Sequence, residues 1–269
     1  MLGGGEGGRS LAVATLSTVV FVGAIVALVV TSSGWDEVKR AFFSGEQFSE
    51  SLPDIAGAFE LNVKLFLLAE VLILVVALGL AVLRSLPGPI FFPLRLLAVA
   101  YVDLFRGVPT VLVIYILGFG APALDIPGLP RSPFFWGIVA LTLVYSAYVS
   151  EVYRAGIDSV HPSQEAAARS LGLTRTQSLR FVVLPQAVRR VIPPLLNDFI
   201  GLQKDTALVA LIGPVEAFRQ SQIEVAGSFN YTPYLATALI FVLLTIPLAR
   251  FTDWLVARDR RRRLAGRGA

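Results

Sequence analysis

Residues 151–187, EVYRAGIDSVHPSQEAAARSLGLTRTQSLRFVVLPQA, form the only long polar interval in an otherwise apolar chain. The interval carries Arg154, Arg169, Arg175 and Arg180, and two more arginines follow at 189 and 190. Three acidic residues oppose these six arginines. In a membrane protein, a short basic loop between two hydrophobic spans lies on the cytoplasmic side. The sequence therefore predicts a cytoplasmic loop with a membrane span on either side.

This loop has the signals of two short helices. Pro162 can open the first helix, Ser163 can cap it, residues 165–169 are strong helix formers, and Gly172 can end it. Thr174 can cap a second helix that stops at Pro185. A loop that only connects two spans needs no internal helices. We therefore expect this loop to dock another molecule.

The composition places the chain among integral membrane proteins. Of its 269 residues 55% are hydrophobic and 16% charged, whereas soluble domains have about 25% charged residues. Apolar runs near 20 residues fit helices that cross a bilayer, and the short alternating segments of a membrane β-barrel are not apparent. The absence of cysteine excludes disulfides and thiolate chemistry. The net charge of +4 comes mostly from arginines after residue 257, which indicate a cytoplasmic flank better than nucleic-acid binding.

An all-α fold with about six transmembrane helices is predicted. The expected spans cover residues 11–31, 61–83, 94–118, 134–153, 193–213 and 235–256. The first apolar run could also be a secretory signal, but no Ala-x-Ala site follows it, which favours a retained helix. Residues 32–60 predict either an interfacial amphipathic segment or an irregular outer loop. We expect three parts: an N-terminal extension (1–54), a transmembrane domain (55–257) and a basic tail (258–269).

The positive charges give a second signal for the topology. If the loop is cytoplasmic and six spans cross the membrane, both termini lie inside. The segments then assigned inside carry Arg9, Arg84, Arg95, six arginines between 154 and 190 and six from 258 onward, whereas those outside carry Lys39, Arg40, Arg131 and Arg219. This bias agrees with the positive-inside rule.

Motifs of an enzyme are not present in the sequence. It has no phosphate-binding loop, no His-Glu-x-x-His pair and no Cys/His metal cluster, and its single histidine, His161, precedes a proline as a turn residue would. The chain is therefore not expected to be an enzyme or to hold a cofactor. If ATP drives its activity, another chain must hydrolyse it.

Charged residues inside the apolar spans are candidates for function, because each costs about 2.5–3.5 kcal/mol in the hydrocarbon. Glu70 either contacts a substrate or cation, or it is protonated or paired with a neighbouring helix. Arg106 precedes Gly107 and Pro109, where backbone irregularity fits a cavity, and with Asp103 it is either a gate or an anchor at the inner face.

A polar stripe marks the fifth expected span. Asn197, Gly201, Lys204 and Leu208 have the spacing of one helix face, and Asp198 and Asp205 lie on an adjacent face. We expect buried charges at Lys204 and Asp205. The stripe lines a substrate route or an interface with a second subunit, unless these charges only hold the helices together.

The loop resembles the signature of ABC-importer permeases: Glu-Ala-Ala, three residues, Gly, nine residues, then aliphatic-x-Leu-Pro. Gly172, Val182, Leu184 and Pro185 fall on that spacing, but the acid is Glu165 where the family's position is 166, and Ser163 replaces the usual glycine. Residues 101–109, YVDLFRGVP, and 204–209, KDTALV, look like the permeases of the polar amino acid uptake family.

This resemblance implies a type I ABC-importer permease core, in the cytoplasmic membrane of a prokaryote, that moves polar amino acids. It implies as partners two ATP-binding subunits that carry the ATP and Mg, a second permease chain, identical or related, and an extracytoplasmic substrate-binding protein. It places a coupling helix at Ser163, Gln164, Glu165, Ala166, Ala167, Ala168, Leu171 and Gly172. Candidates for the substrate route are Glu70, Asp103, Arg106, Asn197, Asp198, Lys204, Asp205 and Thr206.

Alternatives remain open. The cargo could be another small polar solute, such as an opine or a compatible solute. An ion-coupled secondary transporter could use Glu70 or Lys204, but it has no motor to dock, and a structural scaffold would not need a buried Lys204–Asp205 pair. In the coupling helix, either Glu165 docks as the family's acid does, or the small Ala166 and Ala167 dock and Glu165 only favours the helix N-terminus.

Overall fold

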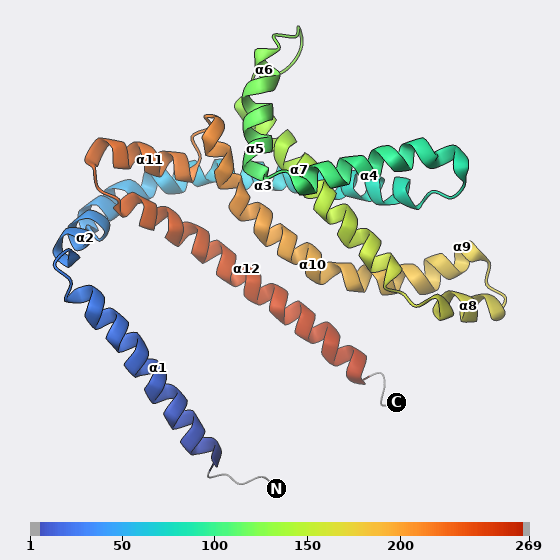
Figure 1. Cartoon of the computed structure of the whole chain (residues 1–269), viewed down its shortest axis with the longest axis horizontal. Helices are drawn as coiled ribbons and strands as arrows, with labels where there is room; N and C mark the ends of the chain where they lie inside the picture. Colours follow the sequence, from blue (N-terminus) through green and yellow to red (C-terminus); the bar gives the residue numbers. More distant parts are fainter. Residues whose placement is uncertain (1–5, 266–269) are drawn as a thin grey trace.

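The computed structural model describes residues 6–265, and all regular secondary structure in that range is helical (Figure 1). The first half contains α1 (Glu6–Val30), α2 (Trp35–Phe42), α3 (Gly45–Ser85), η1 (Pro89–Phe91), α4 (Phe92–Gly107), α5 (Thr110–Tyr115), η2 (Ile116–Gly120) and α6 (Ala121–Ala123). The second half contains α7 (Pro133–Asp158), α8 (Pro162–Ser170), α9 (Arg175–Ser178), η3 (Leu179–Val183), α10 (Leu184–Asp205), η4 (Thr206–Ile212), α11 (Ala217–Ser228) and α12 (Thr232–Ala265). The predicted all-α membrane fold is confirmed. Parts of the glycine-rich start and of the basic tail lie outside the described residues.

Four helices of the described chain are long and apolar enough to cross a membrane: Ser10–Val30, Trp35–Ser85, Pro133–Asp158 and Thr232–Arg258. A fifth candidate is the bent pair Pro89–Gly107 and Thr110–Ala123. The remaining expected span corresponds to α10, which is long enough at 22 residues but too polar to qualify by composition. Its charged residues are Arg189, Arg190, Asp198, Lys204 and Asp205.

The long helix α3 corrects two expectations for the N-terminal third. It begins at Gly45, where Ser44 caps it by accepting a hydrogen bond from the Gln47 N–H, so residues 45–60 are neither a loop nor a separate interfacial segment. Packing explains the extension, because Ile55 is fully buried in a cluster with Ala217 and Ala236. The predicted boundary at residue 54 lies inside this helix.

The third expected span is broken near its middle. The bend between α4 and α5 is 105° and falls at Val108 and Pro109, because proline has no N–H for the helix ladder. The irregular backbone predicted at this place is confirmed. Asp103 and Arg106 lie toward the end of α4, just before this bend.

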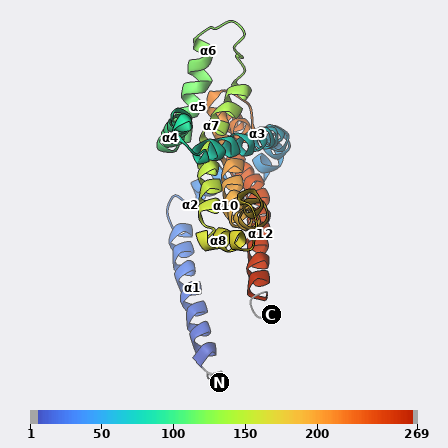
Figure 2. The same ribbon diagram turned by 90° about the vertical axis from the view of Figure 1, so that its right-hand side faces the viewer.

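Helix α7 is at the centre of the bundle. Figure 2 shows it between α4 and α3, and its residues Leu141 and Val144 belong to the main core with Leu65 of α3 and Leu202 of α10. Close approach of α7 and α10 requires a glycine: a Cβ at Gly156 would lie 2.1 Å from Cγ1 of Val191. Helix α1, in contrast, lies apart from the bundle in Figure 1, and none of its apolar window is buried.

Candidate functional site

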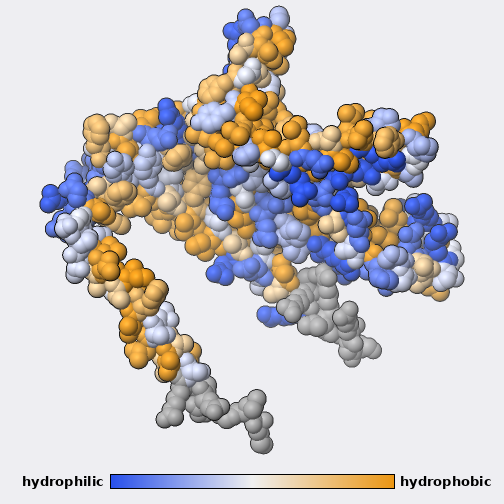
Figure 3. All heavy atoms as spheres, viewed as in Figure 1, coloured by the Kyte–Doolittle hydropathy of each residue, from blue (hydrophilic) through white to orange (hydrophobic). Residues whose placement is uncertain are grey.

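A cavity of about 300 Å³ opens between α4, α7 and α10. Its wall consists of Arg106 from α4, four residues of α7 and Asp198 from α10; the α7 residues are Tyr148, Glu151, Val152 and Ala155. Figure 3 shows hydrophilic side chains gathered on this face between α4 and the α7–α10 pair, where they interrupt the hydrophobic surface. The structure thus brings together Arg106 and Asp198, two predicted route residues that are far apart in the sequence. We call this site the α4–α7–α10 cavity.

Arg106 reaches the cavity from the last turn of α4. Its guanidinium carbon lies 5.8 Å from the centroid of the Tyr148 ring, a cation–π distance. The Tyr148 hydroxyl donates a hydrogen bond to the Arg106 carbonyl at 3.4 Å. Within residues 6–265, the Arg106 guanidinium has no acidic partner at ion-pair distance. The cation is therefore positioned by an aromatic ring and is free to bind an anion.

Asp198 contributes a carboxylate to the same cavity. Its Oδ2 atom is buried and has no hydrogen-bond partner in the described chain. The half-buried Glu70 of α3 interacts electrostatically with Asp198. A buried carboxylate oxygen without a partner is rare in native structures, and in this respect Asp198 differs from Glu151, which is paired with two arginines.

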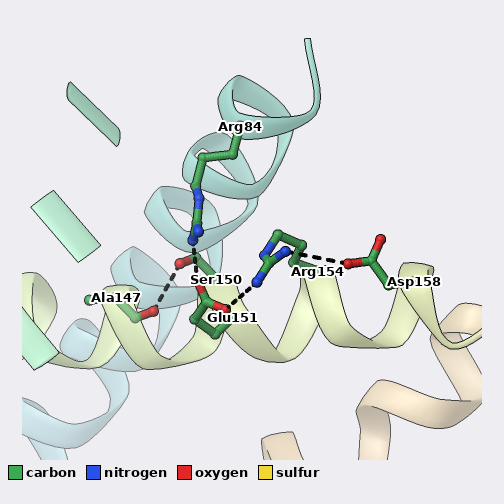
Figure 4. A network of polar contacts seen from close by, with 6 residues as sticks. All are labelled: Arg84, Ala147, Ser150, Glu151, Arg154 and Asp158. Atoms are coloured by element: carbon green, nitrogen blue, oxygen red, sulfur yellow. Dashed lines mark hydrogen bonds and ion pairs between the residues drawn. The ribbon is translucent and has the colours of Figure 1, made fainter. Parts of the chain in front are cut away.

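Glu151 is the other carboxylate of the cavity wall, but it is already paired. It accepts hydrogen bonds from Arg84 of α3 and, at 2.9 Å, from Arg154 one turn further along α7, which also contacts Asp158 (Figure 4). Arg84 and Glu151 are 13% and 20% exposed, so their ion pair joins the end of α3 to α7 in a partly buried place. Glu151 therefore joins the elements of the cavity wall. Asp198 is the acidic residue of the wall that has no ion-pair partner in the described chain.

Lys204 and Asp205 have different surroundings in the structure. The Tyr145 hydroxyl donates a hydrogen bond to Asp205 at 2.9 Å, and Gly201 leaves room for that tyrosine, since a Cβ there would lie 3.3 Å from its Oη. Lys204 is exposed, and Asn197 is exposed too. Lys204 and Asp205 were both expected to be buried, and for Lys204 this is wrong in the single chain. Successive side chains of a helix point to different faces, so Asp205 packs inward while Lys204 does not.

Thr206 belongs to a buried polar network that the sequence analysis missed. Asn62 of α3 donates hydrogen bonds to Thr206 Oγ1 (3.1 Å) and to Glu216 Oε2 (2.7 Å). Glu216 also accepts from the N–H groups of Phe218 and Arg219, which makes it the N-cap of α11, and Asn62 Oδ1 accepts from the Ala217 N–H. We call Asn62, Thr206 and Glu216 the Glu216 network. An asparagine near the start of the second expected span, between Glu60 and Lys64, and an acid two residues after Pro214 were the available signals.

The predicted loop helix is present as α8, with small corrections. His161, and not Ser163, is its N-cap: the imidazole accepts from the Ser163 N–H at 3.2 Å. Gly172 ends the helix with a φ of +90°, as glycine allows, and Thr174 caps α9 in a capping box with Gln177. Pro185 does not stop the second helix, because the π-helical turn η3 leads into α10 without a break.

The exposed part of α8 is narrower than expected. Ala166 and Ala167 are exposed, but Ala168 is only 4% exposed, so it is not free to dock. Leu171 is 84% exposed. Figure 1 shows α8 and α9 projecting at the end of α7 and α10, at the far side of the molecule from α2 and α11. Such an isolated leucine on a projecting helical turn suits contact with another protein.

A metal site is not found in the part of the chain that the structure describes, since no three His, Cys, Asp or Glu side chains come together there. The charged side chains of the cavity can bind a polar ligand, and the projecting loop can bind a protein.

Comparison with known proteins agrees with this division of roles. Residues 85–261 match the sequence family described as binding-protein-dependent transport system inner membrane component. The chain belongs to this family. It is 36% identical over 197 residues to the probable glutamine ABC transporter permease protein GlnM of Bacillus subtilis, covering 71% of this chain and 88% of that protein. It is 32% identical over 205 residues to the arginine transport system permease protein ArtQ of the same organism, covering 75% and 91%.

A solved structure agrees as well. The crystal structure of an amino acid ABC transporter with histidines contains a chain that is 30% identical, with a TM-score of 0.71, covering 77% of this chain and 94% of that chain. The present chain is thus a permease subunit of an ABC transporter and a multi-pass inner-membrane protein. It works in a complex with ATPase subunits, and ATP hydrolysis belongs to those separate proteins.

Proposed function

We propose that this permease moves polar amino acids into the cell, in a complex of two permease chains, two ATP-binding subunits and an extracytoplasmic binding protein. The names of the relatives support an amino acid as cargo, because they include a glutamine permease, an arginine permease and an amino acid transporter with histidines. The observation that carries the proposal is the projecting helix α8 between two long helices of the bundle. Neither a secondary transporter nor a scaffold needs such a docking element.

The α8 helix is the proposed contact with the ATPase. Its attachment supports this role: Val160 after α7 packs with Val183 and Ala187 of the η3–α10 segment, and Arg190 donates a hydrogen bond to the Ser159 carbonyl. A displacement of α8 would therefore move α10, which carries Asp198 into the cavity. The proposed contact residues are Ser163, Gln164, Glu165, Ala166, Ala167, Leu171 and Gly172, with Ala168 as packing.

The proposed topology places both termini and α8 in the cytoplasm. In Figure 2, α8 and the far ends of α1 and α12 lie toward the side opposite α6, which supports this assignment. We propose that α1, which lies apart from the bundle, is an extension added to the transport domain. The exposed face with Asn197 and Lys204 is the proposed contact with the second permease chain.

A cysteine at Ser163 should resist a membrane-impermeant thiol reagent applied outside intact cells, and rapid labelling would contradict the topology.

Uptake by the reconstituted complex tests the function. Proteoliposomes that contain this chain, its ATPase and its binding protein are expected to accumulate labelled glutamine, arginine or histidine only with ATP. Accumulation of none of them, or accumulation driven by an ion gradient without ATP, would contradict the proposal.

Two variants of α8 test the coupling contact. Ala167→Glu is expected to abolish association with the ATPase, because a groove that accepts a methyl group has no room for a carboxylate. Glu165→Gln should leave association nearly intact, since an acid in the first turn is explained by the helix dipole alone, about 0.3–1 kcal/mol. Ala123→Glu, at an exposed alanine of α6, is the matched control. Loss of association in Glu165→Gln would instead assign the contact to the acid.

A further inference from the structure

We propose that a groove between α3, α7 and α10 binds an anionic phospholipid of the cytoplasmic leaflet, with part of an acyl chain in the groove and the phosphate at Arg180. The inference goes beyond the proposed function, because it assigns a site for a membrane lipid and not for the cargo. It rests on the proposed topology, in which α8 and the adjoining ends of α7 and α10 are cytoplasmic.

The groove has a volume of about 160 Å³, and its lining is apolar apart from Ser85 and Tyr153. Its floor consists of buried residues of α3 and α10, namely Ala81, Ala187 and Val191. Its rim consists of exposed large apolar residues: Leu78, Val82, Ile157, Leu184 and Val188. An apolar cavity of about 150 Å³ stays dry and accepts apolar molecules. This groove, which we call the Val188 groove, therefore suits a segment of hydrocarbon chain.

An exposed apolar stripe on α3 leads into the Val188 groove. It consists of large residues with the spacing of one helix face, Val71, Val75, Leu78 and Val82. Contacts between membrane helices are rich in small residues, which let the backbones approach closely, and this stripe has none. The stripe therefore fits lipid better than another helix.

The α10 side of the groove points away from the proposed contact with the second permease chain. Val188 and Asn197 are nine residues apart on one helix, about two and a half turns, so they lie on opposite faces of α10. Lys204 lies near the face of Asn197 by the same spacing. A second permease chain at that face would therefore leave the groove open to the membrane.

Arg180 places a positive charge at the cytoplasmic end of the groove. The turn η3 continues into α10 without a break, so Arg180, Leu184 and Val188, each four residues apart, lie on one face. The Arg180 side chain is exposed, and its guanidinium carbon lies 5.6 Å from the centroid of the Phe181 ring. Within residues 6–265, no acid lies at ion-pair distance from Arg180. A guanidinium without an acidic partner suits a phosphate group.

Three other arginines adjoin groove residues in the sequence, but each already has a partner. Arg84 and Arg154 are paired with Glu151 (Figure 4), and Arg190 donates a hydrogen bond to the Ser159 carbonyl. Arg180 above an apolar groove thus matches the two halves of a phospholipid. A lipid with a net negative charge fits better than a zwitterionic one, because basic residues at the cytoplasmic face attract anionic headgroups.

Lipid binding to the assembled transporter tests the inference. The permease–ATPase complex in detergent is titrated with phosphatidylglycerol or with phosphatidylcholine of the same acyl chains, and native mass spectrometry measures the affinity of the first bound lipids. Phosphatidylglycerol should bind about fivefold more tightly, the effect of one arginine near an anionic headgroup. Equal affinities of the wild type for the two lipids would overturn the inference.

Two sites of substitution separate the phosphate from the chain. Arg180→Gln should abolish the preference for phosphatidylglycerol, whereas Arg180→Lys, which keeps the charge, should retain most of it. Val188→Trp should weaken both lipids alike, because the indole ring fills the groove from its rim.

The matched controls are Arg175→Gln, at another exposed arginine of the same loop, and Leu239→Trp, at an exposed position of α12 outside the groove. Both controls should bind the two lipids as the wild type does. If Arg175→Gln lowers the preference as much as Arg180→Gln, the basic loop attracts lipid without a specific site, and the inference is overturned.

Lipid binding is measured without substrate, so its outcome is independent of the proposed cargo. A complex that accumulates no amino acid but prefers phosphatidylglycerol through Arg180 would contradict only the proposed function. A complex that accumulates one but shows no such preference would overturn only this inference. Arg180 is exposed and has no ion-pair partner in the described chain, so the comparison of Arg180→Gln with the wild type decides even if Val188→Trp does not fold.

Discussion

The Glu216 network and the α4–α7–α10 cavity both place a carboxylate beside α10 and its continuation, but they differ in how the carboxylate is satisfied. Glu216 is fully buried, and its two oxygens accept hydrogen bonds from Asn62, Phe218 and Arg219. Asp198 is half-buried, and its Oδ2 has no partner among the described residues. The fold supplies hydrogen-bond partners for both oxygens of Glu216, whereas it leaves Oδ2 of Asp198 without one.

This difference separates structural from functional polar groups in an apolar environment. A buried polar group without a partner costs free energy, so the fold is expected to satisfy it unless function requires otherwise. The Glu216 network ties α3, η4 and α11 together, which suits a structural role. The cavity joins α4, α7 and α10 without using all their polar groups, which suits binding.

The largest expected effect follows from breaking the Glu216 network. Glu216→Ala removes the N-cap of α11 and leaves the amide of Asn62 and two N–H groups without their acceptor. We expect a loss of folding free energy on the order of 3 kcal/mol. The measurement is the unfolding midpoint and the monodisperse yield of the purified complex.

Glu224 on the same helix provides the control for this variant. Its side chain accepts one hydrogen bond from Gln220 one turn away, and such a pair contributes about 0.2–0.5 kcal/mol. Glu224→Ala should therefore unfold near the wild-type temperature. Equal destabilisation by the two variants would show that the network has no special role in stability.

Local signals explain what could be predicted from the sequence. The end of α8 at Gly172, the cap at Thr174 and the break near Pro109 depend on residues within one or two turns, and all three are confirmed. The extension of α3 was missed because its first turns are polar. They are helical because Ile55 packs on residues that lie far along the chain.

Long-range pairing explains what could not be predicted in the site. Asn62 and Glu216 are separated by 154 positions, and no local pattern states that one satisfies the other. Similarly, Glu151 is paired with Arg84, which lies 67 positions before it, whereas Asp198 Oδ2 has no partner in the described chain. The sequence could nominate Asp198 and Arg106 as candidates, but only the fold distinguishes free charges from paired ones.

A smaller effect is expected at Glu151, the paired carboxylate of the cavity wall. Glu151→Gln keeps an acceptor for Arg84 but removes the charge, and we expect a loss of about 1.5 kcal/mol of stability, the lower value for a hydrogen bond to a charged group. Asp158→Asn is the control, because Asp158 is 65% exposed and pairs only with Arg154 at 3.4 Å. An equal loss in both variants would remove the distinction between the partly buried pair and the surface pair.

The smallest effect on stability is expected at Asp198, although its effect on transport is large. Asp198→Asn is nearly isosteric and breaks no contact of Oδ2, because this atom has none in the described chain. The change in unfolding free energy should therefore be within about 0.5 kcal/mol. ATP-driven uptake should fall, because the cavity loses a carboxylate that no described residue pairs. Glu216→Gln is the informative counterpart, since the same acid-to-amide change places an NH₂ group where the site supplies only donors and should reduce stability. If Asp198→Asn destabilises the complex as much as Glu216→Gln, the carboxylate of Asp198 has a structural role. The distinction between a hydrogen-bonded Glu216 and an unpaired Asp198 is then wrong.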